Sequence, residues 1–534
     1  MCGIHATITT SNNSGLSSEL KQSLINRGPD HFGQAQRELT AANLDGQLHL
    51  YFTSTVLALR GDHVAKQPLE ERTNSGSVLC WNGEAWRINR QPVCGNDGEA
   101  VFAMLQSPAS SSNRGREAHV VDVLRSIEGP FAFVYYDSAA SRLYYGRDRL
   151  GRRSLLIKPS AKTDAIMLSS IASAPTAGWE EVSSDGIWSI NLTTWHGISS
   201  ELSVQEHVTK HIWLEAGSDD MVSSIGLFNR QLPPSKQELD FGSPSLQILR
   251  CKLIESLKPR VLDVPEPPNT ISDVDARIAI LFSGGLDCTV LARLAHELVP
   301  ICQGLDLINV AFENPRQVAI EAGQPHLRAS DMYEGCPDRA TGRKAFAELK
   351  YSCPGRYWRF IAVNVPFAEA MDHKAKVLSL IYPHETEMDL SIAFALLSGS
   401  LRRPRGSTSA RVLLSGLGAD ELFGGLDVSR IGQRNLGRDD RIMAHWGREV
   451  RFPYLDEEFV KFAIGSPVWE KCDFENPFHP AVIDPAKRIL RLLADQLGLP
   501  IAARQKKKAI QFGSRTAKIE STTGRVRGTA QVTT

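Results

Sequence analysis

Residues 277–298 read RIAILFSGGLDCTVLARLAHEL and combine two different hydrophobic patterns around a glycine pair. The apolar run 277–282 is typical of a buried strand, and the segment 287–298 places leucine and valine at helical spacing. A second apolar run follows at 307–312. Strand, glycine turn, helix and strand together predict a βαβ unit, and therefore an α/β domain built on a parallel sheet.

The turn inside this unit has the composition of a ligand-binding loop. Open α/β sheets bind ligands at the carboxyl ends of their strands. Gly284 and Gly285 let the backbone approach a ligand, the helix N-terminus attracts an anion, and Ser283 offers a hydroxyl. Asp287 suits a helix cap or a Mg²⁺ ion bound to phosphate. A glycine pair alone also fits a plain tight turn, and the Walker A pattern GxxxxGK[ST] is absent.

A second segment, RVLLSGLGADELFGG (411–425), has the same form. Ser415, Gly416 and Gly418 shape its turn, and Asp420 and Glu421 stand at the start of the next helix. Carboxylates there are also favourable simply as partners of the helix dipole. If the two strands are neighbours, the two loops can hold one nucleotide from two sides.

The first half of the chain, to about residue 200, reads as mostly β. Short β-branched or aromatic runs at 48–59, 77–86, 129–137 and 141–148 predict strands, and 98–106 predicts a helix. Residues 107–117 have the composition of a loop, 215–245 that of a linker, and the chain after 513 that of a frayed tail. Past the linker, 245–257 carries leucines on one helical face.

The chain opens MCGIHATITT, with a cysteine directly after the initiator methionine. If Met1 is removed, the thiol of Cys2 lies beside its own α-amino group, whose pKa is about 8. One residue then supplies a nucleophile and a base, as N-terminal nucleophile enzymes require. A lone cysteine at position two also occurs by chance, so Cys2 by itself does not decide the chemistry.

The composition limits the class of protein. The 534 residues predict two or three domains, and the 60 basic and 60 acidic residues argue against nucleic acid or an anionic membrane as the main partner. The nine cysteines show no CxxC spacing, which argues against zinc sites and disulfides. With no signal peptide and no apolar run long enough for a membrane span, we expect a cytoplasmic protein.

Several motifs, taken in order, resemble those of the glutamine-dependent asparagine synthetases. The segments MCGI, RGPD (27–30), WNGE (81–84), NDGEAVF (96–102), GPFAFVYYD (129–137) and GRDRLGRRSL (146–155) resemble that family's class II glutamine amidotransferase domain. The segments SGGLD, SGLGADELFGG, REVRFPYLD (448–456) and ARQKKKAIQFGSR (503–515) resemble its synthetase domain. The segments 429–441 and 506–520 are most similar to a divergent branch, the asparagine synthetase domain-containing proteins.

The resemblance implies a fold and a domain order. Residues 1–210 would form an α+β amidotransferase domain of the N-terminal nucleophile (Ntn) hydrolase type, with αββα layers. A linker would follow at 211–245. Residues 246–515 would form an α/β parallel-sheet synthetase domain of the PP-loop, or ATP pyrophosphatase, type. Residues 516–534 would be a disordered tail.

The resemblance also assigns roles in the amidotransferase half. Cys2 would attack the side-chain amide of glutamine, and Asn82 and Gly83 would stabilise the oxyanion. Glu84 and Asp97 would hold the substrate's α-amino group. The arginine that binds the glutamine carboxylate in the family has no counterpart in register, since Val56 stands there, and Arg60 is the candidate four residues on. Both motifs also have a purely structural interpretation. Asn82 and Gly83 could form a hairpin turn, and Asp97 could cap the following helix.

In the synthetase half, the family activates aspartate with ATP and Mg²⁺, and ammonia from the first site attacks the activated carboxylate. Glu385 matches the catalytic glutamate, and Asp287 and Asp420 would bind the metal. The nucleotide would contact Leu281, Ser283, Gly284, Gly285, Asp287, Val310, Ser415, Gly416, Asp420 and Lys506. Glu385 could instead be an exposed cap without a catalytic role. Lys506 to Lys508 could be a run of charges in contact with solvent.

Two departures from the family pattern leave alternatives open. Leu417 replaces a glutamate associated with forming the acyl-adenylate, and Cys288 replaces a serine with a weaker donor. The main hypothesis is asparagine synthesis from glutamine, aspartate and ATP. A nucleotide-binding scaffold that makes no asparagine, or an amide synthetase with another acceptor, are the alternatives. The oligomeric state stays open, with a homodimer as one option.

Overall fold

The structure is a computed structural model of the 534-residue chain, and it describes most of it. The residues outside the description are 1, 41–45, 72–75, 109–114, 175, 196–203, 214–228, 230, 233–238, 269–275, 314–328, 401–406, 425–434, 473–482, 507–508, 517–530 and 532–534. Most of the predicted linker and of the predicted disordered tail falls in these ranges.

The chain divides into two compact units, each described by itself below. Unit 1 consists of Met1–Ser223, Ser379–His384 and Arg430–Arg448. Unit 2 consists of Ser224–Leu378, Glu385–Ser429 and Glu449–Thr534. Two short segments from the half of the sequence expected to form the synthetase domain therefore belong to the unit that contains Cys2.

Unit 1 contains two six-stranded antiparallel sheets. The first has the order β13-β11-β12-β1-β3-β2 and the second β15-β14-β10-β9-β5-β4, with a small third sheet β7-β6-β8. The strands of the first sheet are β1 (Gly3–Thr9), β2 (His31–Thr40), β3 (Gln47–Val56), β11 (Leu156–Ser160), β12 (Ala165–Ser169) and β13 (Glu180–Glu181). Those of the second are β4 (Leu69–Glu70), β5 (Val78–Gly83), β9 (Phe131–Asp137), β10 (Arg142–Arg147), β14 (Gly186–Asn191) and β15 (Val208–Ile212). The short ones are β6 (Arg87–Ile88), β7 (Gln91–Pro92) and β8 (Ile127–Glu128).

Strand β5 shows why the sequence here is almost continuously apolar. Val78 and Cys80 belong to the core shared with β1 and β3, whereas Leu79 and Trp81 belong to the core shared with helices. Successive side chains of a strand point to opposite faces, so a sheet covered on both sides needs apolar residues at every position.

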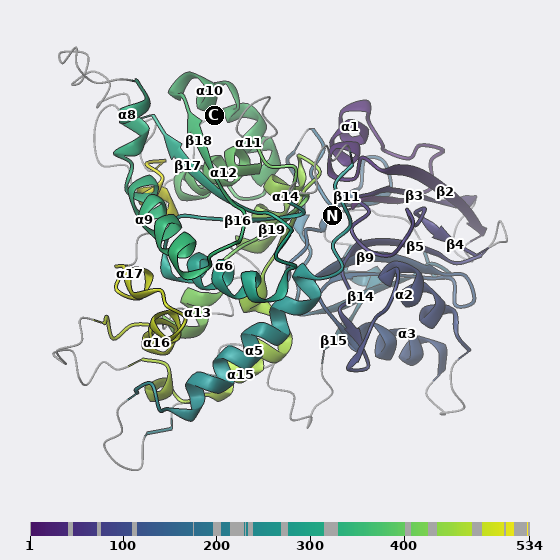
Figure 1. The fold of residues 1–534 in the computed structure, drawn as a ribbon. Helices are drawn as coiled ribbons and strands as arrows, with labels where there is room; N and C mark the ends of the chain where they lie inside the picture. Colours follow the sequence, from purple (N-terminus) through teal and green to yellow (C-terminus); the bar gives the residue numbers. More distant parts are fainter. Residues whose placement is uncertain are drawn as a thin grey trace. The chain divides into compact units, whose positions relative to one another are not determined.

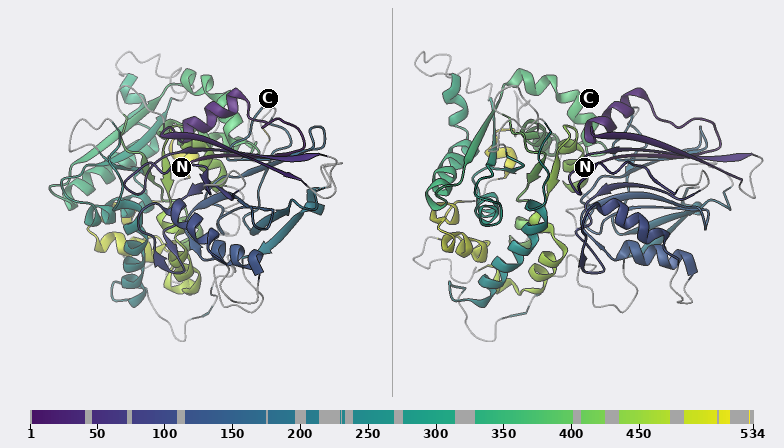
Figure 2. Two further views of the ribbon diagram at one scale, coloured as in Figure 1. Left: turned by 90° about the vertical axis from the view of Figure 1, so that its right-hand side faces the viewer. Right: turned by 45° about the vertical axis from the view of Figure 1, so that its right-hand side comes forward.

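Helices cover the outer faces of the two sheets. Helix α1 (Ser18–Arg27) contacts β1 and β3, and helix α2 (Asp97–Gln106) contacts β4 and β5 and packs against α3 (Gly115–Arg125). Figures 1 and 2 show α1 on one side of the stacked sheets and α2 and α3 on the other. This is the expected αββα arrangement. A short helix, α4 (Val204–His207), precedes β15.

Unit 2 is built on a five-stranded parallel sheet with the order β18-β17-β16-β19-β20, which confirms the predicted α/β fold. Its strands are β16 (Ile278–Leu281), β17 (Leu305–Phe312), β18 (Trp358–Val365), β19 (Val412–Leu414) and β20 (Glu449–Arg451). Strand β16 and helix α6 (Leu286–Leu298) lie within two residues of the predicted ranges, because the change from an apolar run to helical spacing marks the turn between them.

Helices cover both faces of this parallel sheet. Helix α9 (Pro337–Ser352) brings Gly342 against Asn309, whereas α12 (Glu387–Ser400) brings Gly399 against Val310. Asn309 and Val310 are adjacent in β17 and point to opposite faces. The remaining helices of unit 2 are α5 (Pro244–Val261), α8 (Ala329–Glu334), α10 (Phe367–Asp372), α13 (Ala419–Phe423), η5 (Pro453–Leu455), α15 (Glu457–Gly465), η6 (Val468–Glu470), α16 (Arg488–Gln496), α17 (Pro500–Ala503) and α18 (Ile510–Gly513). Helix α11 (Lys374–Ile381) runs from unit 2 into unit 1, and α14 (Gly437–Ala444) lies in unit 1.

Two local predictions need correction. The strand predicted at 48–59 ends at Val56, after which the chain leaves the ladder. The loop predicted at 107–117 includes the first residues of α3, because the polar residues at its start face away from the core that Val120 and Leu124 enter.

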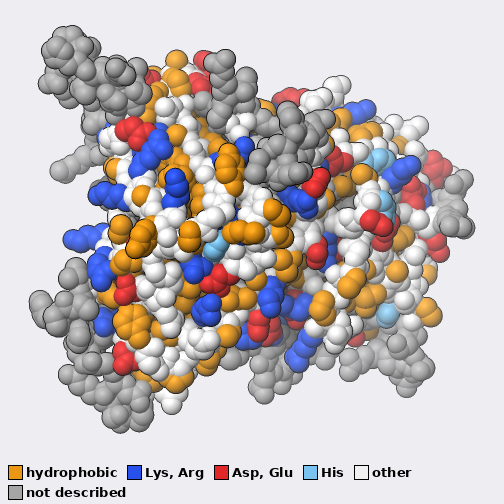
Figure 3. Space-filling view, viewed as in Figure 1, with side chains coloured by type: hydrophobic (Ala, Val, Ile, Leu, Met, Phe, Trp, Pro, Cys, Tyr) orange, Lys and Arg blue, Asp and Glu red, His pale blue; other side chains and the backbone are white. Residues whose placement is uncertain are grey.

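The surface and the helices bear on the class of protein. Basic and acidic side chains are interspersed over the face seen in Figure 3. Among the described helices, none has both the length and the apolar content that a membrane crossing needs. All nine cysteines are free thiols.

Candidate functional site

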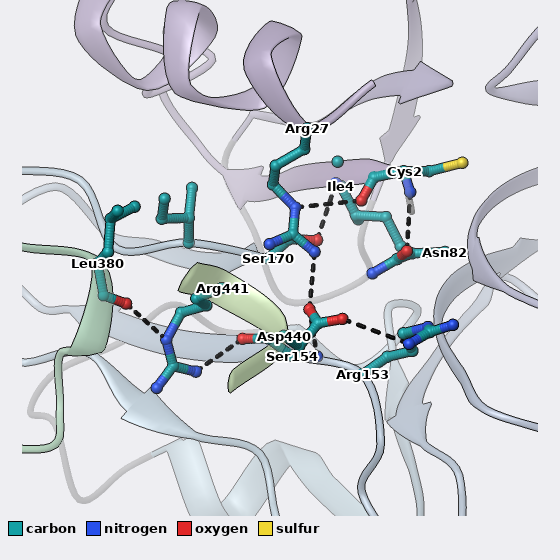
Figure 4. A network of polar contacts seen from close by, with 12 residues as sticks. Cys2, Ile4, Arg27, Asn82, Arg153, Ser154, Ser170, Leu380, Asp440 and Arg441 are labelled. Carbon is teal, nitrogen blue, oxygen red and sulfur yellow. Dashed lines mark hydrogen bonds and ion pairs between the residues drawn. The ribbon is translucent and has the colours of Figure 1, made fainter. Parts of the chain in front are cut away.

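Cys2 is held in place directly before strand β1 of unit 1. Its backbone N–H donates to the side-chain oxygen of Asn82 at 2.9 Å, and its carbonyl accepts from Nε of Arg27 at 3.2 Å. The residue is only 7% exposed. Figure 4 shows these contacts and the thiol of Cys2 directed away from Arg27.

The residue after Cys2 is Gly3, and close packing around it leaves no room for a side chain. A Cβ added there would lie 2.6 Å from the hydroxyl of Thr55 and 2.9 Å from the side chain of Leu24. The same hydroxyl accepts from the N–H of Gly3 at 3.0 Å. Helix α1 therefore packs directly on the start of β1 and fixes the position of Cys2.

Asn82 carries a polar group that the described part of the chain does not use. Its oxygen accepts from Cys2, but its Nδ2 amide is buried without a hydrogen-bond partner in the structure. Buried polar donors are normally satisfied, and such an exception calls for an explanation. Gly83 follows, and a Cβ added there would lie 2.6 Å from the carbonyl oxygen of Pro130. Among the described residues, the amide of Asn82 is thus a buried donor without a partner on the side chain that holds the backbone of Cys2.

Glu84, Asp97 and Arg60 come together next to this pair. Arg60 lies with Nη1 3.6 Å from Glu84 Oε2, donates to the carbonyls of Ala85 and Val93, and covers the ring of Trp86. Arg60 follows the end of β3 at Val56, so it is not part of that strand.

Asp97 accepts from Trp81 Nε1 and from the N–H of Ala85, and so braces the WNGEA stretch. Burial raises the pKa of Asp97, against the charge of Arg60 and these hydrogen bonds. The buried carboxyl groups of Glu84 and Asp97 therefore both lie next to the guanidinium of Arg60.

His5 is the imidazole on the same strand as the start of the site, and it is not available as a base for Cys2. Burial lowers the pKa of His5 to about 4, and its Nε2 lies 3.1 Å from the carbonyl of Ser14. Residues three apart on a strand point to opposite faces. The α-amino group that removal of Met1 would expose therefore stays the predicted base.

The first serine–glycine loop of unit 2 is shaped by close packing. Gly284 has a φ of +79°, and a Cβ added there would lie 2.5 Å from the Cα of Gly342 in α9. The hydroxyl of Ser283 accepts from the N–H of Gly285 at 3.3 Å. The thiol of Cys288 donates to the carbonyl of Gly285, and burial raises its pKa.

The second loop lies directly beside the first. Strands β16 and β19 are paired, and a Cβ added to Gly416 would lie 3.1 Å from the Cβ of Asp287. The N–H of Leu417 donates to the hydroxyl of Ser415. Gly418 has a φ of +104° and packs against Tyr454, whose hydroxyl donates to the carbonyl of Asp287. The two loops therefore share one end of the sheet.

Lys487 joins the two loops. Its ammonium lies 2.8 Å from Asp287 Oδ2 and 2.6 Å from Asp420 Oδ1. Burial opposes the charge on Lys487, but the two carboxylates outweigh it and raise its pKa. Lys487 therefore stays protonated near neutral pH.

The carboxylates of Asp287 and Asp420 suit a cation that phosphate also binds. Among the described residues, no three His, Cys, Asp or Glu side chains come together as a metal cage. Mg²⁺ is commonly held by one or two carboxylates together with substrate phosphates, so a Mg²⁺ ion at this place would share the two aspartates with Lys487.

Leu281, at the end of β16, and Val310, inside β17, both lie close to Gly399 of α12. A Cβ added to Gly399 of α12 would lie 3.4 Å from Val310 and 3.7 Å from Leu281. The two apolar side chains therefore face the same helix, and their predicted contact with the base of ATP stays a prediction.

Glu385 and Lys506 are not joined to the two loops by any hydrogen bond or ion pair found in the described part of the chain. Glu385 is exposed, and its carboxylate accepts from the side chain of Gln531 at 2.5 Å. Lys506 is exposed as well. Their predicted roles depend on the resemblance alone.

Sequence reasoning missed Lys487, Tyr454 and the buried partners of Arg27. Lys487 stands between polar segments and has no motif of its own, and only the fold brings it to the two aspartates. Tyr454 lies inside the quoted segment REVRFPYLD, which was a usable signal.

Two family models match the chain. The model described as asparagine synthase matches residues 271–435 and 426–527, and the model described as a glutamine amidotransferase domain matches residues 54–176. The chain therefore contains an asparagine synthase-type region after an amidotransferase region.

Curated relatives match over nearly the whole chain. A protein named asparagine synthetase domain-containing protein 1 from Mus musculus is 31% identical and covers 97% of both chains. The asparagine synthetase domain-containing protein YML096W from Saccharomyces cerevisiae is 30% identical over 96% of this chain and 90% of its own. An asparagine synthetase (glutamine-hydrolyzing) from Sandersonia aurantiaca is 23% identical over 88% of this chain and 79% of its own.

Proposed function

The chain belongs to the family of asparagine synthetase domain-containing proteins, and on that premise we propose that it is an ATP-dependent glutamine amidotransferase. The observation that carries the proposal is the free Nδ2 amide of Asn82 beside Cys2. A buried donor next to a nucleophile is what a tetrahedral oxyanion needs. We propose cytosolic small molecules as its substrates.

The first half-reaction would occur at Cys2. Its thiolate would add to the side-chain carbonyl of glutamine, and the oxyanion of the tetrahedral intermediate would accept from Asn82. The C–N bond then breaks as the nitrogen takes up the proton that came from the thiol, so that ammonia leaves and a glutamyl thioester remains. Water hydrolyses this thioester to glutamate and frees the thiol. Glu84 and Asp97 supply negative charge for the substrate's α-amino group, and Arg60 supplies the positive charge for its carboxylate. The α-amino group of Cys2 takes the thiol proton, since His5 is neutral and turned away.

The second half-reaction would occur at the two loops of unit 2. ATP would bind with its phosphates at Ser283 to Gly285 and at Ser415, and with its base against Leu281 and Val310. Mg²⁺, held by Asp287 and Asp420, would neutralise phosphate charge. A carboxylate attacks the α-phosphate, pyrophosphate leaves, and ammonia displaces AMP to give an amide. Glu385 and Lys506 enter this scheme through the resemblance alone.

The test follows glutamate and AMP separately. We expect the wild-type chain to release glutamate from glutamine and Cys2→Ala to release none, with AMP formation from ammonia and aspartate intact in the variant. Cys251→Ala is the matched control, because Cys251 is an exposed thiol in unit 2. Equal glutamate release by wild type and Cys2→Ala would refute the first half-reaction.

The acceptor is a separate question because Leu417 stands in the second loop. Leucine cannot accept a proton or bind an ammonium group, so the acceptor has to be tested separately from glutamine hydrolysis. We propose aspartate as the first acceptor to test, with asparagine formed by wild type and by Leu417→Glu. Nucleotide binding without product in the wild type, together with asparagine formed by Leu417→Glu, would favour the scaffold alternative.

A further inference from the structure

Helix α14 (Gly437–Ala444) lies in unit 1, although its sequence falls within the region matched to asparagine synthase. All its residues are buried, including Arg438, Asp439, Asp440 and Arg441. Arg441 donates to the carbonyls of Leu380 and Ile381 and to the hydroxyl of Ser154, which fixes the helix.

Asp440 is the residue of α14 that reaches the surroundings of Cys2. Its Oδ2 lies 2.8 Å from Nη2 of Arg27 and also accepts from the N–H of Ser154 at 3.1 Å. Its Oδ1 lies 3.7 Å from Arg153. Figure 4 shows the guanidinium of Arg27 with Asp440 below it and Cys2 to its right.

The ion pair with Asp440 stabilises the buried charge of Arg27. Both side chains of the pair are 0% exposed, and Nη1 of Arg27 has no hydrogen-bond partner among the described residues. A buried charge is retained only when it is paired, and the geometry of the pair then fixes the guanidinium. The guanidinium in turn donates through Nε to the carbonyl of Cys2.

We propose that Asp440 is a positioning residue for Cys2, acting through Arg27. The glutamine site of unit 1 is then completed by a carboxylate that lies 413 positions after Arg27 in the sequence. The proposal rests on the proposed function in that it names a residue that sets the reactivity of Cys2. It concerns the placement of Cys2, so it is also open to a test that needs no glutamine.

The test compares Asp440→Asn with Asp439→Asn in the full chain. Asparagine keeps an oxygen for Arg27 and Ser154 but loses the charge that holds the guanidinium. Asp439 is the matched control, because it is a buried carboxylate on the same helix that pairs with Arg438. We expect kcat for glutamine hydrolysis to fall about tenfold in Asp440→Asn with little change in KM, since a displaced nucleophile slows chemistry more than binding.

Alkylation of Cys2 by iodoacetamide, followed by mass spectrometry, gives the second readout. We expect its rate to rise about threefold in Asp440→Asn, because a looser Cys2 beside an uncompensated cation is more exposed and more easily ionised. Cys80, which is fully buried in the same unit, should stay protected. A merely structural loss would expose both thiols.

The outcomes separate the two proposals. An unchanged alkylation rate of Cys2, or a parallel rise at Cys80, would overturn the role of Asp440 whatever the glutamine assay gives. Glutamate release that does not depend on Cys2 would overturn the proposed function and leave the alkylation result to decide the role of Asp440.

A double variant covers the case in which Asp440→Asn does not fold. Arg27→Gln with Asp440→Asn removes both buried charges, which costs less than removing one. If Asp440 acts through Arg27, the double variant hydrolyses glutamine at the rate of Arg27→Gln alone. A rate for the double variant well below that of Arg27→Gln would contradict the proposal.

Discussion

The proposed oxyanion role of Asn82 can be tested by a single substitution. Its oxygen holds the backbone of Cys2, and its amide is the donor left over. Asn82→Asp keeps the first contact possible but replaces the donor by a carboxylate oxygen. We expect kcat for glutamine hydrolysis to fall about 100-fold or more, which is the usual cost of one oxyanion donor.

The matched control is Asn96→Asp, because Asn96 caps α2 through its side-chain oxygen and aspartate caps equally well. Steady-state rates of glutamate release decide the comparison. A rate for Asn82→Asp close to that of Asn96→Asp would mean that the free amide has no part in the reaction.

Replacing Lys487 should make the stability of unit 2 depend on Mg²⁺. Breaking a buried ion pair costs about 3–5 kcal/mol, and the partial exposure of Asp287 and Asp420 reduces this to about 2 kcal/mol for Lys487→Met. Because Mg²⁺ can replace the lost ammonium between the carboxylates, millimolar Mg²⁺ should recover part of the loss in thermal unfolding. Lys461→Met, at a surface pair with Glu458, should show no such recovery.

At the scale of the element, the turn between β16 and α6 contains two adjacent glycines whose backbone conformations and packing differ. Gly284 has a positive φ and meets the backbone of α9, whereas Gly285 has a φ of −69° and would bring a Cβ only within 3.3 Å of the Ser283 hydroxyl. We expect Gly284→Ala to cost at least about 2 kcal/mol and to abolish ATP binding. Gly285→Ala should fold and bind.

Thermal unfolding and titration calorimetry with ATP measure both effects. If Gly284→Ala bound ATP as well as Gly285→Ala, the loop would not be the phosphate site.

The sequence predicted the elements whose pattern is local. The apolar run before Ser283 and the helical spacing after Asp287 lie within two residues of β16 and α6, and the two loops are neighbours as expected. Helix α14 could not be predicted in unit 1, because its charged residues are typical of a solvated surface. Only partners such as Arg27 and Glu181, far away in the sequence, allow those charges to be buried.

At the scale of the whole molecule, unit 1 is assembled from three separate segments of the chain, and Glu181 joins them. It lies 3.1 Å from Arg441 of α14, 3.3 Å from Arg147 of β10 and 3.3 Å from His384. Burial opposes its ionisation, but the two arginines and His384 outweigh that and hold the pKa of Glu181 well below its usual value.

This depressed pKa predicts a pH-dependent stability. A carboxyl with a lower pKa in the folded chain adds stability above its unfolded pKa of about 4.3 and loses it as the pH falls toward the folded pKa. Glu181→Gln should therefore lower the free energy of unfolding by about 2–3 kcal/mol at pH 7, and the difference from wild type should shrink below about pH 4. Denaturant unfolding at both pH values measures it.

The control for this prediction is Glu180→Gln, an exposed neighbour on the same strand. It should change stability little at either pH. A difference between Glu181→Gln and wild type that stayed constant with pH would contradict the assigned pKa direction.

The most direct measurement supplies glutamine labelled with ¹⁵N in its side-chain amide, together with aspartate, ATP and Mg²⁺, and follows the label by NMR. We predict that wild type moves the label from glutamine into ammonia or a product amide, and that Cys2→Ala leaves it in glutamine. Label that stayed in glutamine with wild type, or left it equally fast with Cys2→Ala, would contradict the account.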